Sequence, residues 1–192
     1  MDLSHSGSEI LPQIRTIFGM VFGLSVAQLL GGIARIVQHP GKVKVWPVHL
    51  AWVLSTLLFV IHFWWWEMGI THVTEWNFAR YLFLVTFASL FYFLSVLLLP
   101  AHMEEYSGFR DYFFSRKKWF FGVLATIHAA DVVDTLAKGR DYFHSLGTEY
   151  PIRATVLTLL CVIAMFVKSP RFHACFVAAY FIYQVSWIAR YY

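Results

Sequence analysis

Three ionisable side chains interrupt an otherwise apolar segment, where His128, Asp131 and Asp134 follow one another at intervals of three residues. At 100° per residue in an α-helix, these side chains, Thr135 and Lys138 fall within an arc of about 120°. An ionised carboxylate that faced lipid there would be unfavourable by several kcal/mol. The spacing therefore predicts a helix with one polar face, which is turned toward a bundle interior or toward water.

His128 and Asp131 lie one helical turn apart, and this pair is suited to proton chemistry. Imidazole titrates near neutral pH, and a neighbouring carboxylate can exchange a proton with it or share a cation with it. A structural interpretation stays open, in which the helix ends early, Asp134 and Lys138 form an exposed ion pair, and His128 and Asp131 hydrogen-bond across helices. Ligation of a metal or a cofactor is a further alternative.

Two neutral amides, Gln28 and Gln184, lie in other apolar segments and can bridge helices by hydrogen bonds. If both converge with Asp131, all of these groups line one cavity between the first and the fourth helix. The predicted transport pathway consists of His128, Asp131, Asp134, Gln28 and Gln184.

The composition of the chain is that of a membrane protein. Apolar residues make up 59% of the 192 residues and charged residues 14%, whereas soluble domains average about 45–50% and about 25%. The excess apolar surface must face lipid, and a membrane-spanning helix needs about 20 apolar residues. Six segments qualify, at roughly 14–37, 46–67, 77–99, 117–137, 151–168 and 172–190. We therefore predict an all-α fold, a single integral membrane domain built as a compact bundle of six transmembrane helices.

Prolines and glycines mark the ends of these segments. Pro47 and Pro151 lie in the first turns of the second and fifth segments, where a missing N–H is harmless. The last connection, at Ser169 and Pro170, is so short that the final two helices should form an antiparallel hairpin. The hydrophilic stretch 100–118 is expected to include a short surface helix.

The first and fourth segments resemble each other when they are shifted by 103 residues. FGMVFGLSVAQLLGGIARI, from Phe18, aligns with FGVLATIHAADVVDTLAKG, from Phe121. The alignment suggests two repeat halves, 14–99 and 117–190. Each half has three helices, and because this number is odd the two halves would have opposite orientations in the membrane, as in many transporters. Chance alignment of apolar sequences is the alternative.

Small residues recur every fourth position in the first segment. Such spacing lets a second helix approach closely, either within the chain, in another copy or in a partner subunit. The predicted packing residues are Gly19, Gly23, Ala27 and Gly31, with Gly122 in the fourth segment.

Other motifs point away from cofactors and nucleic acid. His49 and His62, thirteen residues apart, are interpreted as membrane-interface histidines and not as haem ligands. The sequence has no C-x-x-C-H, Walker A, G-x-S-x-G or H-E-x-x-H motif. Basic residues are scattered between apolar runs and form no nucleic-acid footprint. We expect no cofactor, no bound metal, no nucleic acid and, on balance, no enzymatic activity.

The charge distribution predicts the orientation in the membrane. Nine lysines and arginines lie near the first, third and fifth connections and six lie on the opposite side, which places both termini outside the cytoplasm. The runs FRDYFFSRKKWFFG and GLSVAQLLGGIARI resemble small bacterial inner-membrane proteins. This resemblance implies a bacterial inner membrane and brings no reaction with it.

The leading functional hypothesis is a small channel or transporter for protons or a small cation, which uses the polar face of the fourth helix. An alternative is a subunit, sensor or anchor that transports nothing and docks a partner helix on the first segment. A third hypothesis is a membrane enzyme or redox carrier that uses buried histidines.

Overall fold

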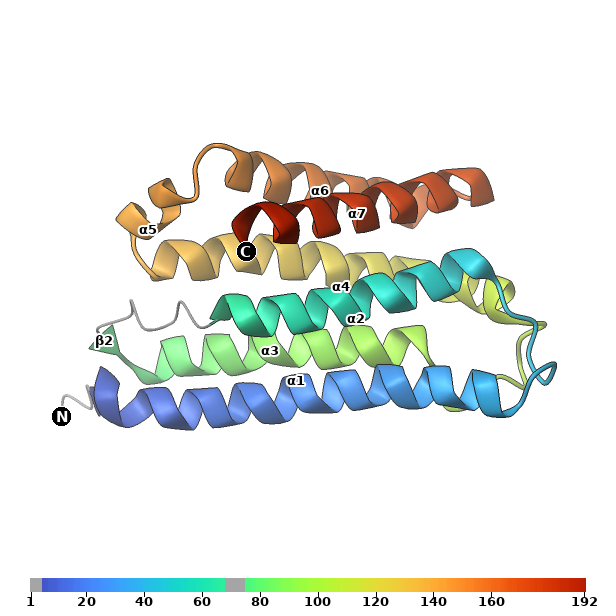
Figure 1. Cartoon of the computed structure of the whole chain (residues 1–192), viewed down its shortest axis with the longest axis horizontal. Coiled ribbons are helices and arrows are strands. Elements are labelled where there is room, and N and C mark those ends of the chain that lie inside the picture. Colours follow the sequence, from blue (N-terminus) through green and yellow to red (C-terminus); the bar gives the residue numbers. More distant parts are fainter. Residues whose placement is uncertain (1–4, 68–74) are drawn as a thin grey trace.

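The computed structural model describes residues 5–67 and 75–192, and six long helices in this part of the chain form an all-α bundle (Figure 1). The long helices are α1 (Gly7–Gln38), α2 (Pro47–Trp66), α3 (Phe78–Leu98), α4 (Phe109–Ala137), α6 (Glu149–Phe166) and α7 (Pro170–Tyr191), with a short α5 (Arg140–Ser145). Two-residue strands, β1 (His5–Ser6) and β2 (Glu75–Trp76), pair antiparallel. The predicted fold class is confirmed.

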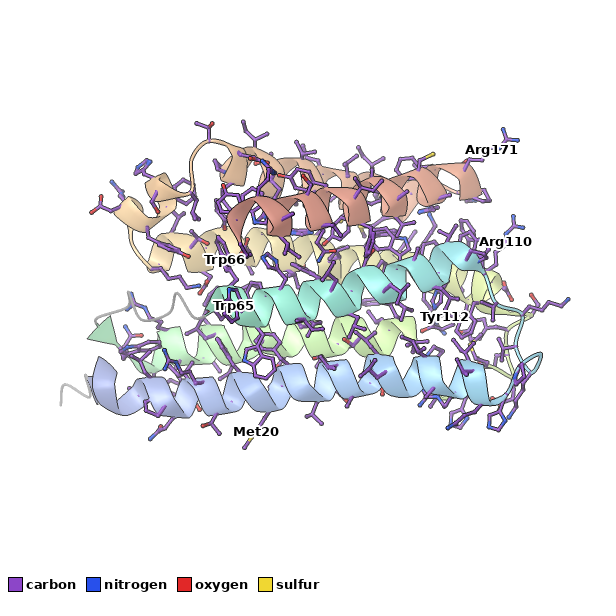
Figure 2. The ribbon with its side chains drawn as sticks, viewed as in Figure 1. Met20, Trp65, Trp66, Arg110, Tyr112 and Arg171 are labelled. Atoms are coloured by element: carbon purple, nitrogen blue, oxygen red, sulfur yellow. The ribbon has the colours of Figure 1, made fainter. Side chains whose placement is uncertain are left out.

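The six long helices are each apolar and long enough to cross a membrane. Large apolar side chains cover the outside of the bundle: Met20 is 62% exposed, Trp65 59% and Ile182 68%, and Met20 projects away from α1 (Figure 2). Water would not tolerate so much exposed apolar surface, whereas lipid does. The chain is an integral membrane protein.

Neighbouring helices in the bundle are not always neighbours in sequence. α1 packs mainly on α3, α4 lies between α3 and α6, and α7 packs on α2. The final two helices are antiparallel as predicted (Figure 1), but α6 rests mainly on α4 while α7 rests on α2. This separation of α6 from α7 is what leaves room for the cavity described below.

The start of α4 differs from the prediction. The helix begins at Phe109, and residues 109–116 belong to it and not to a separate surface helix. Tyr112 and Phe113 from this turn are buried, and the Phe113 ring lies 5.2 Å from that of Trp46. The charged residues of 109–116 mask an apolar face that continues into the bundle, which is why the average polarity of the stretch was misleading.

Gly108 joins the start of α4 to the connection between α1 and α2. The Phe109 N–H donates to the Lys44 carbonyl oxygen at 3.0 Å. A Cβ at Gly108, where φ is +151°, would lie 2.8 Å from Lys44 Cβ and 2.9 Å from its carbonyl oxygen. Only glycine permits this contact, which fixes the segment that contains Lys44.

Three side chains cap the end of α3. The carbonyl oxygens of 97–99 are contacted by Tyr112 Oη at 2.6 Å, His49 Nε2 at 2.8 Å and Gln28 Nε2 at 3.0 Å, in that order. These contacts satisfy carbonyls that a helix end leaves free. His49 lies in the first turn of α2, and its side chain faces the bundle interior, because it is 1% exposed and its ring stacks on Phe109 at 4.7 Å. Its position at the membrane interface stays a prediction.

Candidate functional site

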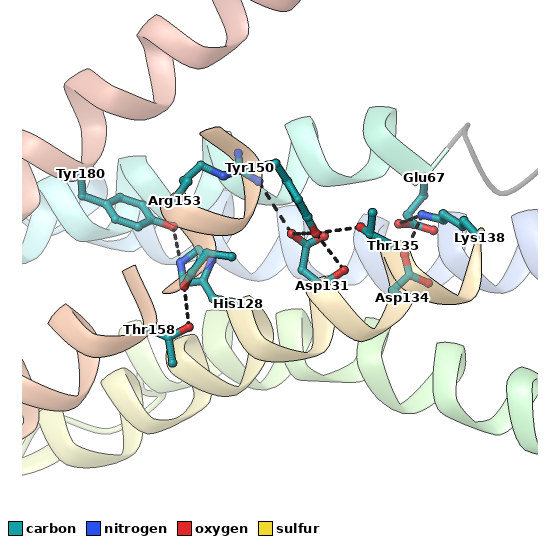
Figure 3. Close-up of polar contacts among 11 residues, drawn as sticks. Glu67, His128, Asp131, Asp134, Thr135, Lys138, Tyr150, Arg153, Thr158 and Tyr180 are labelled. Carbon is teal, nitrogen blue, oxygen red and sulfur yellow. Dashed lines mark hydrogen bonds and ion pairs between the residues drawn. The ribbon is translucent and has the colours of Figure 1, made fainter. Parts of the chain in front are cut away.

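The polar face of α4 is turned into the bundle, as predicted. His128, Asp131, Asp134 and Lys138 are all buried. The alternative of an exposed ion pair at the helix end is wrong, because the side chains of Lys138 and Asp134 are 1% and 3% exposed. The polar face divides into two groups of contacts, one around Asp131 and one around Asp134 (Figure 3).

A cavity of about 40 Å³ adjoins Asp131, and α2, α4, α6 and α7 line it. Its polar wall contains His62, His128, Asp131, Arg153, Tyr180, Tyr183 and Gln184. The predicted position between the first and the fourth helix is wrong, because α1 contributes no residue to the wall. α1 packs on α3, on the far side of the bundle from α6 and α7.

Asp131 has two partners from α6. The Tyr150 hydroxyl lies 2.9 Å from Asp131 Oδ2 and 2.7 Å from Thr135 Oγ1. Arg153 Nη2 lies 3.7 Å from the same Oδ2, a separation at which a bridging water is favoured over a direct hydrogen bond. The Arg153 guanidinium also lies 4.1 Å above the Trp187 ring. The carboxylate is therefore held in place but incompletely paired.

His128 lies deeper in the bundle than Asp131. It lies nine positions before the end of α4 at Ala137, which is about 14 Å along the helix axis. Its Nε2 lies 3.3 Å from the Tyr180 hydroxyl, and its ring stacks on Phe59 at 5.4 Å. The imidazole is the deepest titratable group of the polar face.

An aromatic cluster closes the bundle beyond His128. The Trp52 ring lies 5.3 Å from the rings of Phe120, Phe121 and Phe176. Edge-to-face rings at this spacing pack densely, and the Trp52 Nε1 buried among them has no partner in the described part of the chain. The cavity therefore ends in an aromatic layer on the side away from the chain termini.

Four nitrogens in the residues of the cavity wall lack partners. These are Nε2 of His62, Nε1 of Trp66, Nε of Arg153 and Nε1 of Trp187. A buried donor without an acceptor costs about 1–3 kcal/mol. A water needs about 10–15 Å³, so the cavity has room for about three. Bound water would supply the missing partners, so the cavity is suited to hold water.

An ion pair lies between the ends of α6 and α7 beside the cavity. Glu149 accepts from Arg190 at 2.6 and 2.8 Å, and the Tyr183 hydroxyl donates to Glu149 at 2.9 Å. The side chains of Arg190 and Glu149 are 47% and 39% exposed. Polar groups thus continue from the bundle surface through Tyr183 to Asp131.

The second group on α4 is sealed. Lys138 Nζ lies 2.6 Å from Asp134 Oδ2 and 2.8 Å from Glu67 Oε1, and none of the three side chains exceeds 3% exposure. Burial and the charge of Asp134 raise the pKa of Glu67 to about 8, although Lys138 opposes the shift. Burial lowers the pKa of Lys138, but the two carboxylates outweigh this effect and raise it. One proton on Glu67 leaves this cluster electrically neutral.

The two predicted glutamines lie in different places. The Gln184 amide inserts beside α2, where its oxygen accepts from the Phe59 N–H at 2.9 Å and its nitrogen donates to the Ser55 carbonyl at 3.3 Å. Gln184 therefore joins His128 and Asp131 at the cavity. Gln28 caps α3 at the opposite end of the bundle and does not meet them.

The predicted packing residues of α1 form an uncovered face. Gly23 and Ala27 are exposed, and a Cβ at Gly23 would meet nothing within 4 Å. A Cβ at Gly19 would lie 3.7 Å from Trp64, and one at Gly31 would meet only Arg35 at 4.0 Å.

The close helix approach that was predicted for this face occurs instead at the neighbouring Gly32, whereas Gly122 in α4 makes only an ordinary contact. A Cβ at Gly32 would lie 2.8 Å from Leu99 Cβ, so Gly32 is where α1 meets the end of α3. At Gly122 a Cβ would lie 3.7 Å from Met165 of α6.

Sequence reasoning missed three residues of the two sites: Glu67, Tyr150 and Arg153. Tyr150 and Arg153 are three apart at the start of α6 and so share a helix face. That spacing was a usable signal. Glu67 follows three tryptophans at the end of α2, and nothing local reveals its partner.

Comparison of the chain with protein-family models, curated proteins and solved structures finds no match. Within residues 5–67 and 75–192, no group of three or more His, Cys, Asp or Glu side chains is arranged to hold a metal ion. The site offers a half-paired carboxylate, an imidazole one turn deeper, tyrosine hydroxyls and room for water. These are the parts of a proton relay.

Proposed function

We propose that the protein is a proton-transporting membrane protein, in which Asp131 takes up a proton from the hydrated cavity. The observation that carries this proposal is the position of Asp131 on the wall of that cavity, within the bundle and next to Tyr150 and Arg153. Arg153 beside Asp131 and Lys138 beside Asp134 would repel a metal cation. These positive charges do not prevent the Asp131 carboxylate from exchanging a proton with water.

The proposed route has three steps. Water in the cavity delivers a proton to the Asp131 carboxylate. At the same time the Tyr150 hydroxyl turns from Asp131 toward Thr135, whose hydroxyl can accept its hydrogen bond. Asp131 then passes the proton through cavity water to His128, one turn deeper. The Tyr180 hydroxyl, 3.3 Å from His128 Nε2, is the next group in reach, and it would relay the proton by releasing its own hydroxyl proton to a further water.

The aromatic cluster favours a carrier over an open pore. The cluster around Trp52 blocks water beyond His128, so the cavity serves one side of the membrane in this conformation. With nine basic residues at the opposite end of the bundle, the positive-inside rule places the mouth of the cavity outside the cytoplasm. Protons would therefore enter from the exterior.

Proton flux into proteoliposomes tests the proposal, with a pH-sensitive dye inside and an imposed membrane potential. Asp131→Asn keeps the shape of the side chain and its hydrogen bond with Tyr150 but cannot carry a proton. Loss of a positioned acid–base group should lower flux about a hundredfold. Asp131→Glu should retain most of the flux, because it can still titrate.

The matched control is Asp141→Asn on α5, an exposed carboxylate outside the cavity, which should conduct like the parent. A structural role for Asp131 would give the opposite order, with the isosteric Asn tolerated better than the longer Glu. That order, or a parent protein that conducts no protons, would rule the proposal out.

A second candidate function is a membrane subunit that docks another helix on α1. The uncovered face around Gly23 and Ala27 favours it, because close helix approach is a main source of association in lipid. Native mass spectrometry in mild detergent tests this candidate. A stoichiometric complex that Gly23→Leu dissociates would support it, and a monomeric parent would exclude self-association.

A further inference from the structure

A second, larger cavity lies at the end of the bundle opposite the proton cavity. It has a volume of about 590 Å³ and is formed by the connection that follows α1 and the one that follows α3. Sites for small molecules commonly measure about 300–1,000 Å³. We call it the basic pocket, because its rim contains Arg35, Lys42 and Lys44.

The positive charge of the rim is not neutralised within the described part of the chain. Arg35, Lys42 and Lys44 are exposed, and none of them pairs with an acidic side chain of residues 5–67 or 75–192. Glu104 also lines the pocket, but it lies 3.8 Å from His102. The lining of the pocket therefore has an excess of positive charge, which would favour an anionic ligand.

The inner wall of the basic pocket is apolar. Ile36, Val43, Leu99, Met103 and Phe109 line it. A free inorganic anion would gain nothing from these side chains, whereas a ligand with both an anionic and an apolar part would contact both surfaces.

The pocket is fixed by the contacts of its connecting segments. Gly108 lies against Lys44, whose carbonyl accepts from the Phe109 N–H at 3.0 Å. The turn at Gly41, where φ is +87°, is closed by a bond from the Lys42 N–H to the His39 carbonyl at 3.2 Å. The cations are thus on an ordered frame, which lowers the entropy cost of binding.

The pocket lies at the ends of two helices that are long and apolar enough to span a membrane, where lipid headgroups are expected. It adjoins the last turn of α1, which ends at Gln38, and the end of α3 at Leu98. Its wall includes Val45, which is 44% exposed. Apolar membrane-facing surface and water-facing cations therefore meet at one place.

We propose that the basic pocket binds an anionic phospholipid, whose phosphate lies among Arg35, Lys42 and Lys44 and whose glycerol and upper acyl groups follow the apolar wall into the bilayer. Basic pockets between transmembrane helices bind anionic headgroups in this way. The orientation inferred from charge places this end at the cytoplasmic leaflet, where anionic lipids concentrate. The proposal does not depend on proton transport.

Native mass spectrometry of the full chain in neutral detergent tests the proposal, by titration with phosphatidylglycerol and, separately, phosphatidylcholine. The pocket variant carries Arg35→Gln, Lys42→Gln and Lys44→Gln. The matched control carries Arg110→Gln, Lys118→Gln and Arg171→Gln, three exposed basic residues outside the pocket, two of which project from the same end of the bundle (Figure 2). Both variants lose three charges.

The parent should prefer phosphatidylglycerol, and the pocket variant should bind it about a hundredfold more weakly, since each removed charge contributes to headgroup attraction. The control variant should bind within a few-fold of the parent. Equal loss in the two variants would show a general charge effect and overturn the proposal. Equal affinity for the two lipids would also overturn it. Displacement of phosphatidylglycerol by millimolar inorganic phosphate would assign the pocket to free phosphate instead.

Discussion

Asp131 and Asp134 lie three residues apart on one helix, and both are buried, yet their surroundings differ. Asp131 contacts a cavity, accepts a hydrogen bond from the Tyr150 hydroxyl and lies 3.7 Å from Arg153. Asp134 is paired directly with Lys138 at 2.6 Å and lines no part of that cavity. Both carboxylates are buried, so burial alone does not distinguish their surroundings. Contact with the cavity does.

The difference originates in helix geometry. Three residues turn a helix by about 300°, so the two side chains point about 60° apart. This angle directs Asp131 toward the space between α6 and α7, and Asp134 toward the end of α2. Lys138 follows Asp134 by four residues, the spacing at which side chains of a helix meet.

The strongest way to test this comparison is to remove the cation of the sealed cluster. Lys138→Met would leave Glu67 and Asp134 buried without a counter-charge, and loss of one partner of a buried ion pair costs about 3–5 kcal/mol. Thermal unfolding in detergent should show a large drop in stability. Lys168→Met, at an exposed lysine, should leave the unfolding temperature unchanged. An equal, small effect of both variants would contradict the description of a sealed cluster.

The pH dependence of stability tests the proton on Glu67. Its pKa is raised from about 4.5 to about 8 by burial and by Asp134, so the folded state binds this proton more tightly than the unfolded state. The resulting stability is fully present below pH 4.5 and decreases as the pH rises to about 8. The unfolding temperature of Glu67→Gln should therefore rise relative to that of the parent between pH 4.5 and about pH 8. Above about pH 8 the difference between the two proteins should stay constant. A constant difference between the two proteins at every pH would contradict this assignment.

The smallest expected effect comes from the hydrated site. Tyr150→Phe removes the hydroxyl between Asp131 and Thr135, but cavity water can replace it. Stability should fall by about 1 kcal/mol, the net value of a typical hydrogen bond, while proton flux should fall about tenfold. Tyr92→Phe on α3, at a tyrosine that is 40% exposed and lies outside the cavity, is the control. A loss of stability as large as that of Lys138→Met would show that the two sites do not differ in access to water.

Most of the fold follows from hydropathy and helix punctuation. The ends of α2, α3, α6 and α7 lie within two residues of the predicted segments, because prolines and polar caps mark them. The start of α4 was missed because Phe109 and Phe113 are separated by charged residues that face outward. The repeat of residues 14–99 and 117–190 stays a prediction.

The candidate site could be predicted only where it lies within one helix. His128 and Asp131 follow from spacing on α4, whereas Arg153 and Glu67 come from elements whose neighbours depend on tertiary packing. Gln28 and Gln184 show the limit most directly. Both are amides in apolar helices, but α7 packs on α2 beside the cavity while α1 packs on α3, and no local pattern encodes that choice.

The separate packing of α6 on α4 and of α7 on α2 has a mechanical consequence. The cavity beside Asp131 lies along the seam between these two helix pairs. Side-chain hydrogen bonds, ring edges such as those of His128 with Tyr180, and the Glu149–Arg190 ion pair make the contacts there. We expect a rotation of one pair against the other to be the motion that would widen this seam beside Asp131 and His128 without unpacking either pair. Such a rotation would have to break the Glu149–Arg190 ion pair between α6 and α7.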